Sequence, residues 1–138
     1  DLPPEQVPEF VRGLEGFDIV AGEKRQQMAE GGYPLSRRFM SRGYVLLNRF
    51  LFDLPVEETQ TGLKAFRRNV LDDILPRVEH RGWAFDLELI VRAHRAGYTI
   101  TSAPVTVHVS PKGAPVRPSM IYDLAKDSLK MAWKLKKR

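Results

Sequence analysis

The chain has no cysteine, only three histidines and no long apolar run. The absence of cysteine excludes disulfides, thiolate nucleophiles and zinc sites built on cysteine. His80, His94 and His108 lie far apart and do not have the spacing of metal ligands, so we interpret them as structural. No stretch of about eighteen apolar residues and no secretory signal pattern is present. We therefore expect a cytosolic protein or one bound to a surface.

The composition is that of a folded domain with a basic surface. The chain has 138 residues, of which 43% are hydrophobic, which is enough for one domain with a real core. Its 22 Lys and Arg against 17 Asp and Glu leave a net charge of +5. This sign favours anionic partners such as phosphates, acidic lipid or nucleic acid. A nucleic-acid-binding module is the less favoured alternative, because aromatic residues are not interleaved with the basic ones.

The first two predicted elements indicate the fold class. Residues 3–16 predict a short amphipathic helix, with Pro3 and Pro4 in its first turn and Gly16 after its end. The run FDIVAG at 17–22 predicts a strand buried on both faces of a parallel sheet. Such a strand needs neighbouring strands and helices above and below it, so we expect an α/β domain whose N-terminal portion precedes this sequence.

The remaining elements follow from periodicity and from the positions of glycine and proline. We expect a polar loop at 23–35, a long helix at 36–54, a strand at 63–68 and a short helix at 69–78. A second long helix at 83–97, one bent strand or a strand pair at 98–109, a second loop at 110–119 and a final helix at 120–138 follow. Pro104 disfavours a central position for the last strand.

The final helix has two faces of different character. Lys126, Lys130, Lys134 and Lys137 line one face, opposite an apolar one. Two interpretations remain open: the helix lies on an anionic membrane leaflet, or it packs on the sheet. We accordingly divide the chain into a domain portion, 1–118, and a basic amphipathic helix, 119–138.

The stretch ETQTGLKAFRRNV, from residue 58, combines an acid, small hydroxyls, a glycine and three cations. Gly62, flanked by Gln60, Thr61 and Lys64, predicts a tight turn that presents hydrogen-bond donors to an anion. A polar turn entering an edge strand is the alternative.

Six segments, taken in order, resemble the dolichol-phosphate mannose synthase type of family 2 glycosyltransferases: DLPPEQVPEF, DIVAGEKR, YPLSRRFMSRGY, ETQTGLKAFRR, FDLELIVRAHRAGY and APVTV. The resemblance implies a GT-A fold with a Rossmann-like sheet, of which the N-terminal nucleotide-binding part is missing here. It implies a metal-dependent, inverting transfer of a sugar from a nucleotide-diphosphate sugar to a polyprenyl phosphate. It also implies a peripheral location at the cytoplasmic face of the membrane. We expect this segment alone to be inactive.

The resemblance also implies roles for particular residues. Asp1 is expected to hold a divalent metal, Mg²⁺ or Mn²⁺, and the alternative is a helix N-cap. The residues expected to bind the two phosphate-bearing substrates are Lys24, Arg37, Ser41, Gln60, Thr61, Gly62, Lys64, Lys112 and Arg117. Each cation among them has the alternative of a solvated surface residue.

Three carboxylates are candidates for the chemistry. A phosphate monoester with a second pKa near ~6 is mostly dianionic at neutral pH and hardly needs a general base. We therefore expect Glu58, Asp86 and Glu88 to orient other groups, and we favour Glu88 as the pocket-facing, catalytic carboxylate. Glu58 departs from the aspartate common in the family, which makes a direct role doubtful. Alternatives are a saccharide acceptor, which would require a true base, and a non-catalytic interaction domain.

Overall fold

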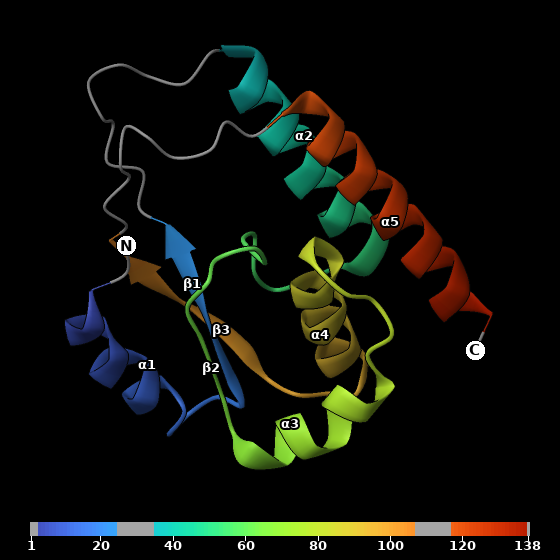
Figure 1. Cartoon of the computed structure of the whole chain (residues 1–138). Coiled ribbons are helices and arrows are strands. Elements are labelled where there is room, and N and C mark those ends of the chain that lie inside the picture. The colour runs from blue at the N-terminus through green and yellow to red at the C-terminus, as the bar shows by residue number, and fades with distance from the viewer. Residues whose placement is uncertain (1–2, 25–34, 107–116, 138) are drawn as a thin grey trace.

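The computed structural model describes residues 3–24, 35–106 and 117–137, which form a small sheet with helices on both faces (Figure 1). Strand β1 (Ile19–Lys24) lies between β2 (Lys64–Phe66) and β3 (Ile100–Val105). β1 pairs with β3 in parallel and with β2 in antiparallel fashion. The α/β class is confirmed, but the sheet is mixed rather than parallel.

The central strand has the burial that its sequence predicts. Ile19, Val20 and Ala21 are all buried, so both faces of β1 are covered. β3 is one continuous strand, in register with β1 from Ile19↔Ile100 to Lys24↔Val105. Among the described strands, only β1 pairs with β3, which is why Pro104 is tolerated in it.

Helices cover the two faces of the sheet. On one face, α1 (Val7–Gly13), preceded by a 3₁₀ turn at Pro4–Gln6, packs Phe10 with Val20, Ala103 and Val105. On the other face lies the larger core, to which α4 (Trp83–Arg95) contributes most. Helix α3 (Arg68–Ile74), followed by a 3₁₀ turn at Leu75–Arg77, closes the lower end of this core. The expected helices above and below the sheet are thus confirmed.

The two longest helices lie side by side beyond α4 (Figure 1). Helix α2 (Leu35–Phe52) and helix α5 (Pro118–Lys136) run in the same direction. α5 buries Ser128, Met131 and Ala132 and contacts both α2 and α4. The final helix therefore packs on other helices rather than on the sheet as the second interpretation expected, and its opposite face is exposed.

The apolar periodicity predicted helix α2, but it did not predict which side of the helix is exposed. Phe39 and Phe50 are 82% and 89% exposed, and Leu46 between them is also exposed. The opposite side of the same helix buries Asn48. α2 therefore turns an apolar stripe away from the domain. No helix in the described ranges is long and apolar enough to cross a membrane.

Candidate functional site

The predicted turn lies against the C-terminal half of β1. The backbone N–H of Gly22 donates to the carbonyl of Leu63 at 2.9 Å. A Cβ added to Gly22 would come within 2.8 Å of both the Leu63 oxygen and the Thr61 methyl group. Gly62 itself is exposed. Gly22 therefore lets the backbone of the turn come close to β1, whereas the role of Gly62 toward a substrate stays a prediction.

Lys64 is the buried cation of this turn. Its side chain is only 6% exposed, and its Nζ lies 3.1 Å from Oδ1 of Asp86. The same ammonium group donates to the carbonyl oxygen of Thr61. A buried ammonium group is stable only when it is paired and hydrogen-bonded, and these two contacts meet that need. They join the turn, β2 and the first turn of α4.

A second ion pair lies beside the first at the end of β1. Lys24 Nζ is 3.7 Å from Oε1 of Glu58, and both side chains are partly exposed. An exposed pair of this kind contributes little to stability, so these groups remain available to other charges. We call Lys24, Glu58, Lys64 and Asp86 the turn-site charges. Thr61 adds a buried hydroxyl that has no hydrogen-bond partner within the described part of the chain.

The structure describes only some of the other residues that the sequence predicts for the site. Gln60 is half-buried in the turn, whereas Ser41 and Arg117 are exposed near the N-terminal ends of α2 and α5. Asp1 and Lys112 lie outside the described residues, as does the side chain of Arg37. Among the residues that are described, no group of three or more histidine or acidic side chains could hold a metal ion.

Glu88 points away from the turn and into the protein. It is 1% exposed. Its Oε2 accepts from the backbone N–H groups of Glu79 and His80, and His80 Nδ1 lies 2.9 Å away from it. Its Oε1 accepts from Arg92 Nε at 2.6 Å. Asp86, two residues away and therefore rotated by about 200° around the helix, is the carboxylate that lies beside Lys64 at the turn. A catalytic role for Glu88 stays a prediction.

The protonation state of Glu88 follows from these contacts. Burial raises the pKa of the carboxyl group, but the hydrogen bonds from His80, Arg92 and Glu79 together outweigh burial and leave the pKa below its ordinary value. Glu88 is therefore ionised at neutral pH.

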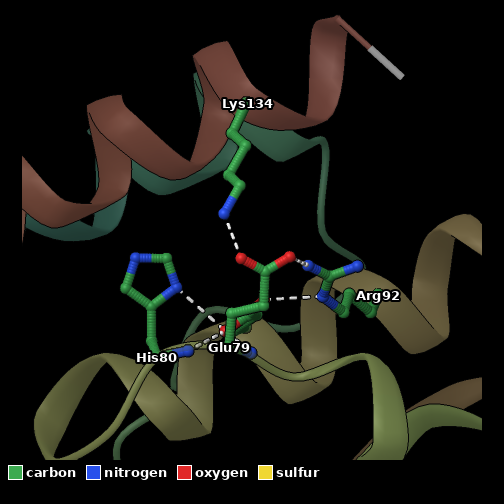
Figure 2. A network of polar contacts seen from close by, with 5 residues as sticks. Glu79, His80, Arg92 and Lys134 are labelled. Atoms are coloured by element: carbon green, nitrogen blue, oxygen red, sulfur yellow. Dashed lines mark hydrogen bonds and ion pairs between the residues drawn. The ribbon is translucent and has the colours of Figure 1, made fainter.

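The network continues from Glu88 to the C-terminal helix. Figure 2 shows Glu79 between Arg92 of α4 and Lys134 of α5. Arg92 Nη2 is 3.5 Å from Glu79 Oε1, and Lys134 Nζ pairs with Glu79 Oε2. These contacts tie α5 to α4 and to the segment between α3 and α4.

Sequence reasoning missed one residue at this site. Gly22 was interpreted only as the end of a strand, yet its backbone lies close to the Leu63 carbonyl oxygen. Asp86 was expected to orient another group, and it pairs with the basic side chain of Lys64.

No family model matches the chain. Curated proteins do match it, among them the following three. Glycosyltransferase AglD of Haloferax volcanii is 32% identical over 92% of this chain and 19% of its own length. The undecaprenyl-phosphate mannosyltransferase of Micrococcus luteus is 30% identical over 75% of this chain and 43% of its own length. A dolichyl-phosphate hexose transferase of Haloferax volcanii is 33% identical over 75% of this chain and 44% of its own length.

The chain belongs to the family 2 glycosyltransferases. The expected resemblance is thereby confirmed. Because the chain spans less than half of these relatives, it corresponds to part of a family member. A mixed α/β arrangement with a small sheet is consistent with part of a GT-A fold.

Proposed function

We propose that this chain is part of an enzyme that transfers a hexosyl group from a nucleotide-diphosphate sugar to a polyprenyl phosphate. The names of two relatives, an undecaprenyl-phosphate mannosyltransferase and a dolichyl-phosphate hexose transferase, support this acceptor class. The GT-A fold of the complete catalytic domain is part of the same proposal.

The observation that carries the proposal is the buried Lys64–Asp86 pair under the turn at 59–63. A fixed cation stabilises the negative charge that develops on a leaving diphosphate. Asp86 holds the Lys64 ammonium group in place, and the Thr61 carbonyl restricts it further. Lys64 needs no reorganisation when charge develops nearby, which is the condition for effective electrostatic catalysis.

The proposed reaction is a single displacement with inversion. An oxygen of the acceptor phosphate forms a bond to the anomeric carbon, while the bond from that carbon to the diphosphate oxygen breaks. The electron pair of the broken bond leaves with the nucleoside diphosphate. The attacking phosphate is mostly dianionic near neutral pH, so no proton has to be removed. Positioning two phosphate-bearing molecules against their mutual repulsion is then the main task of the protein.

Dependence on Mg²⁺ or Mn²⁺ is part of the proposal and depends on the family resemblance and on Asp1. The described residues do not assemble a metal site by themselves. We therefore assign no step of the reaction to the metal.

The membrane is the proposed location of the acceptor, at the cytoplasmic face. Two adjoining helices support this: α2 exposes Phe39, Leu46 and Phe50, and α5 exposes Tyr122, Leu129 and Trp133. The two exposed sets have the same spacing along their helices. We call these six residues the outer apolar face. Exposed lysines on α5, such as Lys126 and Lys130, supply attraction to anionic lipid.

Replacing Lys64 with alanine in the full-length protein tests the proposal. We expect the rate of transfer to a polyprenyl phosphate to fall about a hundredfold, as for loss of one preorganised group at a developing charge. Arg68→Ala, which removes an exposed cation of α3, is the control and should retain full activity. Polyprenol without its phosphate should not be an acceptor. Unchanged turnover by Lys64→Ala would refute the assignment.

A further inference from the structure

A cleft lined by arginines lies at the far end of α4 from Asp86. It has a volume of about 340 Å³ and is lined by Arg77, Arg92, Arg95, Ala96 and Leu135. The 3₁₀ turn after α3, the C-terminal half of α4 and the last turn of α5 each contribute to it. Its only charged lining residues are the three arginines, so every charge on the wall of the cleft is positive.

The carboxylates that pair with these arginines lie outside the cleft lining. Arg77 bonds Asp73, which also accepts from the Tyr98 hydroxyl. Arg92 bonds Glu88 and Glu79. Each of these carboxylates takes up only part of a guanidinium group that carries five N–H donors. Several donors of Arg77 and Arg92 therefore have no protein acceptor within the described ranges.

Arg95 is the exception among the three, because its hydrogen-bond acceptor is neutral. Its Nη1 donates to the backbone carbonyl of Leu135 at 2.9 Å. This contact holds the guanidinium group at the end of α5 without cancelling its charge. The cleft thus has one full positive charge with no carboxylate partner among the described residues, beside two that are only partly neutralised.

We propose that this cleft binds a phosphate-class oxyanion, either free phosphate or the phosphomonoester headgroup of a lipid. Guanidinium groups bind tetrahedral oxyanions through paired N–H donors, and three arginines line this cleft. The site is separate from the turn-site charges, which lie at the other end of α4, and it does not depend on the proposed transferase function. Bound anion would neutralise Arg95 at the point where that residue anchors the end of α5.

Two single substitutions and one control test the site. Arg77→Gln and Arg95→Gln each remove one lining cation, while Arg92 is left intact because it holds Glu88. Arg68→Gln is the matched control: Arg68 pairs with Asp72 four residues away, as Arg77 does with Asp73, but it does not line the cleft. The folding of each variant is checked by circular dichroism and thermal unfolding without phosphate.

The first measurement is titration of the full chain with inorganic phosphate, followed by NMR of the arginine side chains at constant ionic strength. We expect saturable binding that each cleft variant weakens about tenfold, because each removes charge-assisted hydrogen bonds to the anion. The control should bind as the unsubstituted chain does. Equal weakening in all three variants would show general screening and would overturn the proposal.

The second measurement distinguishes the source of the anion. Vesicles containing phosphatidic acid, which carries a phosphomonoester, are compared with phosphatidylglycerol vesicles of the same surface charge. Stronger binding to phosphatidic acid that is lost in Arg77→Gln and Arg95→Gln supports a lipid headgroup. Saturable phosphate binding without any such lipid preference supports the free anion. If neither measurement depends on Arg77 or Arg95, the cleft is not an anion site.

Discussion

Glu88 and Arg92 are linked one turn apart on α4, with Oε1 of Glu88 accepting from Arg92 Nε at 2.6 Å. Glu88 is 1% exposed and Arg92 11% exposed, and Glu88 also accepts two backbone hydrogen bonds from the segment that follows α3. The carboxylate therefore holds this segment against the helix that carries Asp86. These contacts support a positioning role for Glu88.

Neutralising Glu88 should destabilise the fold. Glu88→Gln removes the nearer and more buried of the two carboxylates that pair with Arg92 and leaves only the longer contact with Glu79, so we expect a loss of about 3 kcal/mol in the free energy of unfolding. Glu79→Gln is the control, because Glu79 is a more exposed member of the same network and should cost under about 1 kcal/mol. Urea unfolding of both variants measures the difference. Equal stability of the two variants would contradict the structural role of Glu88.

Ionisation of Asp18 should make the free energy of unfolding depend on pH. Its carboxylate accepts from the Thr99 backbone N–H at 2.8 Å and from the Thr99 hydroxyl at 3.0 Å, which joins the starts of β1 and β3. The backbone hydrogen bond from Thr99 is the main cause that lowers the pKa of Asp18. A lowered folded-state pKa means that the unfolded chain takes up the proton first as the pH falls.

We therefore expect Asp18→Asn to cost about 1 kcal/mol of unfolding free energy at neutral pH. The stabilisation by the ionised carboxylate is fully present above the ordinary aspartate pKa, near ~3.9. It disappears as the pH falls through the lower folded-state value, so the two stability curves should converge there. Asp72→Asn, which affects only an exposed pair with Arg68, should show no such convergence. A constant difference at all pH values would contradict the assignment.

Gly22 should not tolerate a side chain. In Gly22→Ala the new Cβ would lie 2.7 Å from Val105 Cγ2 and 2.8 Å from the Leu63 carbonyl oxygen, and the backbone oxygen cannot move aside cheaply. We expect a loss of about 1–3 kcal/mol, typical of overpacking. Gly43→Ala is the control, because nothing lies within 4 Å of its added Cβ on α2, and it should stabilise the helix by about 0.5–1 kcal/mol. Thermal unfolding of the two variants should show shifts of opposite sign.

The outer apolar face should mediate attachment to membranes. Replacing Phe39 and Phe50 together with serine removes two large exposed side chains of α2 without touching the core. We expect co-sedimentation with acidic vesicles to weaken at least about tenfold, since burying one such side chain is worth roughly 1.5–3 kcal/mol. Val11→Ser, an exposed apolar residue on α1, is the control. Unchanged sedimentation of the double variant would exclude α2 as the attachment surface.

Several elements were predictable from local patterns. The apolar residues of FDIVAG lie in β1, where Ile19, Val20 and Ala21 are buried because both faces of the strand are covered. Helix α4 ends two residues before Gly97, whose φ of +89° is the left-handed conformation expected of a glycine after a helix. Lys64 was expected to face an anion because it is a hydrogen-bond donor beside a glycine turn, and in the structure it pairs with the carboxylate of Asp86.

Other features could not be predicted from neighbours in sequence. Periodicity gave the position of α2 but not which side faces outward, because an apolar stripe is equally regular on either side. The partners of Asp86 and Glu88 could not be predicted for a related reason, since Lys64 and His80 come from separate segments of the chain.

The amino-acid sequence alone determined the order of helices and strands, the family and the cation-rich turn, because these depend on residue type and on spacing along the chain. Only the tertiary structure decided that Lys64 pairs with Asp86, that Gly22 makes the close contact, and that three arginines from separate elements line one cleft. Each of these depends on distances between segments far apart in sequence, which are set when apolar side chains from all of them pack into one core.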